Sequence, residues 1–298
     1  MAEITRERLG QIIEAVLTVL RDHPDGLQAA AVVGEVERRL PPTPFERTDD
    51  PSAPGKRRYE RIVRFSTIGP VKAGWMVKDR GVWTITETGQ AAIGRYTDPA
   101  ELARESDRLY RQWRADQPDD GDAAATGADD PGADSPTIAL EEAEEAAWAE
   151  IARYLAAMPP YDFQKLVSAL LEAMGYHIAW VAPPGPDQGI DIIAATDPLG
   201  AAGPRIKVQV KRLQGKVAVD GIRSFMAVLG GNDIGLFVCT GGFTSEAQRE
   251  ARTQETRRIT LIDARQLLDL WIAHLDRLPE AARRYLPLRP VHFLAPEV

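Results

Sequence analysis

Three polar residues in the C-terminal half have the side-chain types that metal-assisted phosphodiester hydrolysis uses. Asp191 opens one predicted strand, and Gln209 and Lys211 end the next strand, with Gln209 eighteen positions after Asp191. Antiparallel pairing of the two strands brings these residues close together, and the period of two places Gln209 and Lys211 on the same face. The spacing therefore predicts a small cluster of a carboxylate, an amide and an amine.

Each member of this cluster has a role in that chemistry. Asp191 can bind Mg²⁺ while several waters complete the coordination shell. Gln209 can offer its carbonyl oxygen as a neutral ligand or orient a metal-bound water. Lys211 can stabilise the charge that develops at phosphorus or help to deprotonate the attacking water. On spacing alone, a turn aspartate and a surface lysine form the simpler interpretation.

The elements around these residues predict an α/β sandwich with a mixed central sheet. The run over residues 234–240 is continuously apolar, which is typical of a strand buried on both faces. The order is helix, three strands, helix, strand, helix, strand and helix. The predicted ranges are 162–174 for the first helix, 176–181, 190–196 and 205–211 for the three strands, and 221–229, 234–240, 245–256, 259–262 and 264–275 for the rest.

The N-terminal third predicts a winged helix, a mostly helical domain with a small β wing. Apolar residues recur at helical spacing over residues 4–20 and 32–40. A third helix starts at residue 56 and is interrupted by Gly69 and Pro70. A hairpin with its turn at residues 79–81 follows. In this architecture the third helix lies in the major groove of DNA.

Basic residues gather on the third predicted helix and on the wing. Spacings of three and four place Arg57, Arg61 and Arg64 on one helix face, opposite much of the apolar set. A DNA-binding face explains this pattern, and so does a solvated face on a protein-interaction winged helix; we favour DNA contact. The candidate DNA-binding residues are Arg57, Arg58, Arg61, Arg64, Lys78 and Arg80.

An acidic segment separates the two ends of the chain. The net charge of the 298 residues is −8, but residues 97–150 alone carry 4 basic and 16 acidic side chains. The two flanking parts are each slightly basic, so the overall charge does not exclude a nucleic-acid partner. We expect a DNA-binding domain at 1–96, an acidic flexible linker at 97–139, a catalytic domain at 140–275 and a tail at 276–298. The linker is either a passive tether or a competitor for a basic face of the neighbouring domain.

Several classes of protein are excluded or disfavoured by the sequence. No run of about 18 apolar residues is present, so we expect no membrane span. The N-terminus lacks the basic-then-apolar pattern of a secretory signal, and with the single cysteine, Cys239, we expect a reducing cytoplasm. The glycine pairs are not followed by the Lys-Ser/Thr of a phosphate-binding loop, so no nucleotide cofactor is expected. Cys239 lies in an apolar run and is interpreted as a buried small hydrophobe.

The cluster around Asp191 also resembles a known family. The run from Asp187 to Ile192 and the run from Val208 to Arg212 are similar to the PD-(D/E)XK nuclease core, and more closely to its Mrr subgroup, in which glutamine takes the usual acidic place. The similarity extends over residues 160–272. The stretches Lys72–Trp75 and Arg80–Trp83 resemble the winged-helix domain that precedes that nuclease, so two modules recur in the same order.

This resemblance implies a type IV, modification-dependent restriction endonuclease that cuts methylated double-stranded DNA with Mg²⁺. It maps the catalytic residues onto Asp191, Gln209 and Lys211, with Asp191 and Gln209 as metal ligands. A double-strand cut needs two active sites, so we expect a homodimer or larger assembly at least on DNA. The alternatives are a catalytically weakened DNA-binding regulator and a structure-selective nuclease of the Holliday-junction type.

One position departs from the family pattern. Many relatives have glutamate directly after the phenylalanine of the first helix, whereas Phe163 is followed here by Gln164. We expect this change to remove a metal-binding carboxylate and to weaken Mg²⁺ binding, so that Gln164→Glu would strengthen it. Asp187 is a candidate for a compensating charge, and capping of a turn after Pro186 explains it equally well.

Overall fold

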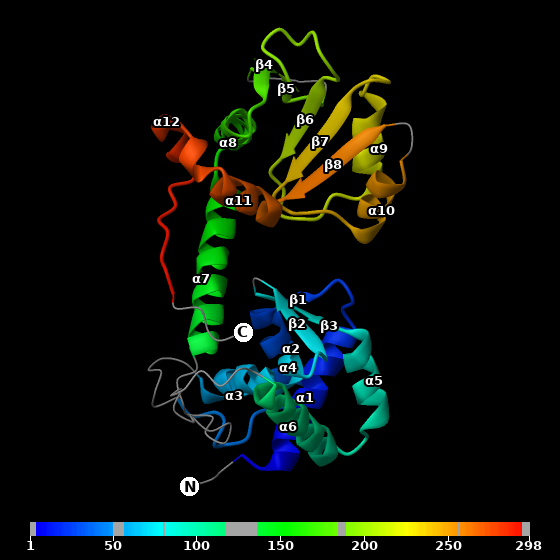
Figure 1. The fold of residues 1–298 in the computed structure, drawn as a ribbon, viewed down its shortest axis with the longest axis vertical. Helices are drawn as coiled ribbons and strands as arrows, with labels where there is room; N and C mark the ends of the chain where they lie inside the picture. Colours follow the sequence, from blue (N-terminus) through cyan, green and yellow to red (C-terminus); the bar gives the residue numbers. More distant parts are fainter. Residues whose placement is uncertain are drawn as a thin grey trace. The chain divides into compact units, whose positions relative to one another are not determined.

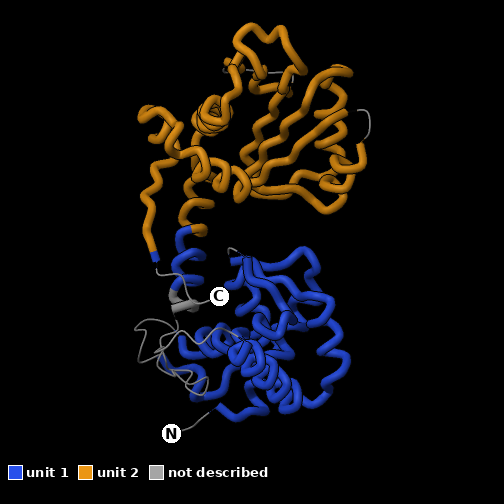
Figure 2. Tube along the Cα trace, in the orientation of Figure 1, with its two compact units in different colours: residues 1–147, 293–298 blue, residues 148–292 orange. Residues whose placement is uncertain are grey.

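The computed structural model describes residues 4–49, 57–79, 81–116, 136–183, 189–254 and 257–293. The chain divides into two compact units, residues 1–147 with 293–298 and residues 148–292 (Figure 2). Among the described residues, no helix has both the length and the apolar character needed to cross a membrane.

The first unit is mainly helical and carries a small antiparallel sheet (Figure 1). The sheet has the order β1-β3-β2, in which β2 and β3 form the predicted hairpin, with Met76 opposite Ile85. The helices are α1 (Arg6–Arg21), α2 (Ala29–Arg39), α3 (Arg58–Ser66), α4 (Ile68–Lys72), α5 (Glu87–Arg95) and α6 (Pro99–Ala115), and the strands are β1 (Leu27–Gln28), β2 (Met76–Asp79) and β3 (Val82–Ile85). The third helix is interrupted as predicted, but at Thr67 and not at Gly69 and Pro70, which lie within α4.

The apolar stripe of α1 forms the centre of this unit's core. Its residues Ile12, Leu17 and Leu20 are fully buried against the neighbouring helices and Trp83 of the hairpin. Helix α1 begins after Thr5, whose hydroxyl accepts a hydrogen bond from the Arg8 amide at 3.1 Å and so satisfies one of the unpaired amides of the first turn.

The expectation of a flexible linker at 97–139 is wrong for Pro99–Ala115, because these residues form helix α6. Leu102, Ala103 and Ser106 give this highly charged helix one narrow buried face. The helix approaches α1 so closely that a Cβ atom on Gly10 would lie 1.8 Å from the Pro99 carbonyl oxygen. The composition of the segment obscured this stripe, because three small or apolar side chains suffice where glycine removes the steric barrier.

The second unit is built around a five-stranded mixed sheet of order β4-β5-β6-β7-β8. β4, β5 and β6 pair antiparallel, whereas β6, β7 and β8 pair parallel. This confirms the predicted mixed sheet and the predicted order of elements. They are α8 (Pro160–Ala173), β4 (His177–Val181), β5 (Ile192–Ala195), β6 (Ile206–Lys211), α9 (Val219–Ala227), β7 (Ile234–Cys239), α10 (Ser245–Thr253), β8 (Arg258–Asp263), α11 (Ala264–Ala273), the 3-10 helix η1 (Leu275–Arg277) and α12 (Glu280–Arg283).

Two separate apolar clusters cover the two faces of this sheet. Val208 and Val238 pack with α8 and α11, whereas Phe237 and Cys239 pack with α9 and α10. Figure 1 shows these helix pairs on opposite sides of the sheet. Because β7 alternates between the two clusters, it is buried on both faces, as its continuous apolar run predicts. Burial raises the pKa of the Cys239 thiol, in agreement with a structural role.

Helix α7 (Pro136–Ala157) contributes residues to both units. Glu141 and Glu145 belong to the first unit, and Leu155 is fully buried in the core of the second. Near the C-terminal end of the second unit's sequence, Leu278 and Leu286 are buried in that same core. Part of the expected C-terminal tail therefore packs on its own unit, because its leucines extend the apolar cluster.

Candidate active site

Asp191 and the end of β6 lie side by side in the sheet. β5 and β6 are antiparallel neighbours, with Ile192 opposite Val208. The Asp191 amide donates a hydrogen bond to the Val208 carbonyl at 2.8 Å. The Val210 amide donates in turn to Asp191 Oδ2 at 2.8 Å. The carboxylate is therefore anchored on the main chain between Gln209 and Lys211.

Gln209 and Lys211 share one face of β6, as their spacing predicts. In the parallel register Gln209 lies beside Phe237 and Lys211 beside Cys239, both of which belong to the α9–α10 side of the sheet. The Gln209 side chain is buried, and Lys211 Nζ lies 5.6 Å from the centre of the Phe237 ring. Within the part of the chain that the structure describes, Lys211 forms no salt bridge.

Gly189 lies directly beside the side-chain amide of Gln209. Its φ of +82° is a left-handed conformation that favours glycine. A Cβ atom at this position would lie 3.1 Å from Gln209 Nε2. The lack of a side chain thus allows the main chain of Gly189 to lie directly against the Gln209 amide.

We expect Gly189→Ala to lower DNA cleavage at least tenfold, because the new methyl group displaces Gln209. The left-handed backbone itself costs about 1–2 kcal/mol. Gly175→Ala is the matched control, since Gly175 also has a positive φ but a Cβ there would meet no atom within 4 Å. Thermal unfolding and cleavage rates should show similar losses of stability in both variants and a loss of activity in Gly189→Ala alone. Equal cleavage rates in Gly189→Ala and Gly175→Ala would show that Gly189 has no part in the active site.

Gln164 supports Asp191 from helix α8. Its side chain is buried, and Nε2 donates hydrogen bonds to the Asp191 carbonyl at 3.0 Å and the Ala182 carbonyl at 3.1 Å. The Ala182 amide also donates to the Asp191 carbonyl, at 2.7 Å. Two carbonyl acceptors determine which end of the amide carries the nitrogen. Gln164 therefore positions the main chain of Asp191, and this donor role is one that a carboxylate does not supply.

The donor set suits a hard divalent cation. Asp191 offers a carboxylate, and Gln209 is an amide whose oxygen is of the kind that Mg²⁺ accepts together with waters. Asp187, the candidate for an additional charge, lies outside the described residues. Among the residues that are described, no group of three His, Cys, Asp or Glu side chains is arranged to hold a metal. A cation here would therefore keep several waters, which is the usual state of protein-bound Mg²⁺.

The basic residues of the first unit are less open than their sequence pattern predicts. Arg57 is half-exposed and pairs with Glu37 at 2.6 Å, and the Arg58 guanidinium lies 4.3 Å from the centre of the Phe45 ring. Arg61 is buried. Arg80 lies outside the described residues.

Arg64 and Lys78 are covered by glutamates of α7, so the predicted basic face is not open at these two positions in the structure. Arg64 Nη2 lies 2.7 Å from Glu145 Oε2, and Lys78 Nζ lies 2.8 Å from Glu141 Oε2. Burial alone would lower the pKa of Arg64, but the hydrogen bonds and charge of Glu145 raise it above its ordinary value. Burial lowers the pKa of Lys78, and Glu141 offsets only part of this effect.

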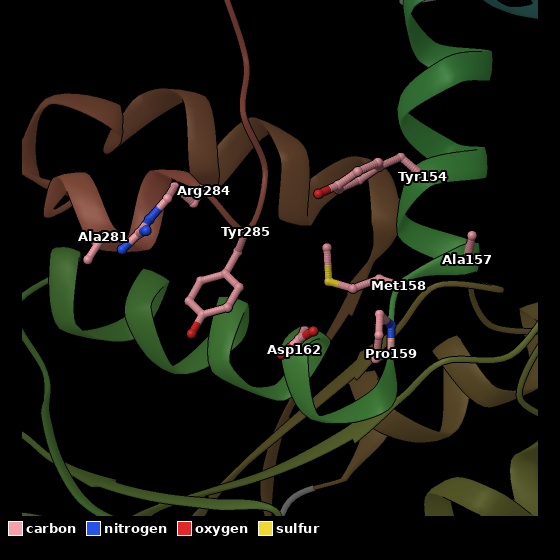
Figure 3. Close-up of a pocket in the computed structure, with 8 residues that line it drawn as sticks. All are labelled: Tyr154, Ala157, Met158, Pro159, Asp162, Ala281, Arg284 and Tyr285. Atoms are coloured by element: carbon pink, nitrogen blue, oxygen red, sulfur yellow. The ribbon is translucent and has the colours of Figure 1, made fainter.

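A cavity of about 500 Å³ lies elsewhere in the second unit (Figure 3). It is found where the end of α7 and the start of α8 meet the segment around α12. Its lining residues are Tyr154, Ala157, Met158, Pro159, Asp162, Ala281, Arg284 and Tyr285. None of them belongs to β5 or β6, so this cavity is separate from the Asp191 cluster.

Comparison with known proteins shows that the second unit is similar to restriction endonucleases. Residues 155–271 match the Mrr catalytic-domain family, whose description is restriction endonuclease. The sequence is 28% identical over 295 residues to the type IV methyl-directed restriction enzyme EcoKMrr of Escherichia coli strain K12, covering 88% of this chain and 90% of that protein. The family range includes all five strands of the sheet together with Gln164, Asp191, Gln209 and Lys211. Restriction endonucleases generally use divalent metal ions.

Among solved structures, one match is the MspJI restriction endonuclease in complex with a 27-mer oligonucleotide. It is 15% identical, covers 69% of this chain and 47% of the MspJI chain, and has a TM-score of 0.33. That score does not establish a common fold.

Proposed function

We propose that the chain is a Mg²⁺-dependent type IV restriction endonuclease that cuts methylated DNA. The match of residues 155–271 to the Mrr catalytic-domain family and the similarity to EcoKMrr support a DNA-hydrolysing nuclease. The observation that carries the proposal is the junction of β5 and β6, where the Val210 amide holds the Asp191 carboxylate beside Gln209 and Lys211. The methylation requirement rests on the similarity to the methyl-directed enzyme.

Each residue of the junction has a part in this reaction. Asp191 and Gln209 would hold Mg²⁺, which when bound polarises a phosphoryl oxygen and lowers the pKa of a bound water. Lys211 faces the scissile phosphate and stabilises the additional negative charge of the transition state. Gln164 holds the main chain of Asp191 in place from behind. The hydrogen bond from the Val210 amide to the Asp191 carboxylate keeps the carboxylate in the same orientation during the reaction.

The first unit is proposed as the DNA-binding domain, a winged helix with α3 as the recognition helix and β2–β3 as the wing. The half-exposed Arg57 at the start of α3 supports DNA contact at the helix end that a groove would receive. We place this domain within residues 4–116 and the nuclease within 148–292, with two copies of the chain acting together for a double-strand cut.

Cleavage of matched plasmids tests the proposal. Methylated and unmethylated preparations of one supercoiled plasmid are incubated with the full chain in Mg²⁺ and in EDTA, beside a four-way junction. We expect linear product from methylated plasmid in Mg²⁺ alone. Equal cutting of both plasmids would overturn the methylation requirement, and cutting of the junction alone would favour a structure-selective nuclease. DNA binding with no cutting under any condition would favour the weakened regulator.

A further inference from the structure

The first part of α7 lies directly on the proposed DNA-binding surface of the first unit. Glu145 accepts hydrogen bonds from both terminal nitrogens of Arg64, each at 2.7 Å. Glu141 accepts two from Lys78, at 3.0 and 2.8 Å. Glu142 Oε1 adds a third carboxylate 4.0 Å from Arg64 Nε. Both cations are therefore held by pairs of carboxylate oxygens, which are strong charge-assisted contacts.

These contacts bury the cations they hold. The Arg64 side chain is 3% exposed and the Lys78 side chain 10% exposed. The helix also comes close to the hairpin turn, since a Cβ atom on Gly81 would lie 3.0 Å from Glu145 Cγ. A phosphate group reaches neither nitrogen centre while the glutamates remain in place.

The acidic residues repeat along α7 in a way that suits a basic surface. Glu141 and Glu145 are four residues apart and so lie on one face of the helix, about 6 Å apart along its axis. Residues 136–150 contain five glutamates and no lysine or arginine. Glu144 and Glu150 are exposed. The helix thus presents a row of negative charge to the cations, as a DNA backbone would.

We propose that the first part of α7 is an intramolecular competitor of DNA for the surface made by α3 and the β2–β3 hairpin. DNA binds this surface when Glu141 and Glu145 leave Lys78 and Arg64. The inference rests on the proposed function of the first unit as a DNA-binding domain. Under this proposal, the apparent association constant for DNA equals the intrinsic constant multiplied by the fraction of molecules in which the helix is displaced.

The test compares two double variants of the full chain with the same change in charge. Glu141→Gln with Glu145→Gln removes the carboxylates that hold the cations, and Glu144→Gln with Glu150→Gln removes two exposed ones. Binding of a fluorescent 30-base-pair methylated duplex is measured in EDTA, so that no cutting occurs. We expect the first variant to bind about tenfold more tightly, a coupling within the usual 5–150-fold range, and the second to change affinity less than twofold. Equal changes in both would overturn the proposal.

Adding Lys78→Ala separates this proposal from the function on which it rests. In the Glu141→Gln, Glu145→Gln background, we expect Lys78→Ala to lower the affinity for the duplex, because the exposed lysine then contacts phosphate. If Lys78→Ala had no effect on the affinity in that background, the proposal that this surface binds DNA would itself be wrong. A clear loss there, combined with unchanged affinity of the parent double variant, would overturn the competition alone.

Hydrogen exchange in the unmodified chain gives a second readout that does not depend on the variants folding. Amides of residues 140–147 should exchange faster when a saturating amount of the duplex is added in EDTA, because the helix loses its partners. Slower or unchanged exchange of these amides in the presence of bound duplex would contradict displacement.

Discussion

Lys211→Ala is expected to lower the rate of DNA cleavage by about 10²–10³-fold, the usual loss on removing one group that stabilises transition-state charge. The affinity for DNA in EDTA should change little, because the lysine acts at the scissile phosphate. Lys211→Met is a second variant that keeps the aliphatic stem beside Phe237 and removes only the charge. Single-turnover cleavage of an end-labelled methylated duplex measures the rates.

Lys207→Ala is the matched control for this prediction. Lys207 lies on the same strand and the same face, but it pairs with Asp233 at 2.8 Å and donates to the Val228 carbonyl at 3.1 Å. We expect this variant to cut at a rate close to that of the unmodified chain. If Lys211→Met cut as fast as Lys207→Ala, the lysine would have no part in the chemistry.

Gln164→Glu is expected to impair the enzyme, which reverses the expectation from the family pattern. An ionised carboxylate donates no hydrogen bond, so the Asp191 and Ala182 carbonyls would lose the Nε2 contact and face a buried negative charge. Leaving buried polar groups without a partner costs about 1–3 kcal/mol. We expect a loss of stability of that size and at least tenfold slower cleavage at pH 8.

The pH dependence distinguishes the positioning role of Gln164 from a metal-binding role. Burial beside two carbonyl oxygens raises the pKa of the new carboxyl group, and its protonated form can donate one hydrogen bond. The ratio of variant to unmodified cleavage rates should therefore rise as the pH falls from 8 to 6. Gln164→Leu should show a constant deficit, and the exposed Gln248→Glu none. A ratio that rises toward alkaline pH, with activity above the unmodified chain, would show that a carboxylate here assists the metal.

Much of the fold was predictable because its elements have strong local patterns. The alternation of Ile206, Val208 and Val210 with polar residues identified β6, and the stripe of α1 predicted the helix that centres the first core. The antiparallel pairing of β5 with β6 followed from their consecutive order, because no helix is predicted between the two strands. These features depend on residues near one another in the chain, where periodicity is informative.

The features that sequence reasoning missed depend on partners distant in the chain. Helix α6 was hidden because its buried face is narrow and depends on Gly10 of α1 for close packing. Gln164 was compared with a carboxylate by its position, but its contacts with Asp191 and Ala182 follow only from the placement of α8 beside the sheet. The glutamates of α7 lie more than sixty residues after Arg64 and Lys78 in the sequence. Only the high negative charge of this segment indicated that it could contact a basic surface.

The central claim is that Asp191 holds the divalent cation beside Lys211, and cation binding by Asp191→Asn tests it most directly. This substitution keeps an oxygen that can accept the Val210 amide hydrogen bond and removes the negative charge. Mn²⁺, as a paramagnetic probe of the Mg²⁺ site, is titrated by electron paramagnetic resonance into the full chain with the methylated duplex bound. We predict saturable binding by the unmodified chain and at least tenfold weaker binding by Asp191→Asn. Equal Mn²⁺ affinities in the two proteins would contradict the account.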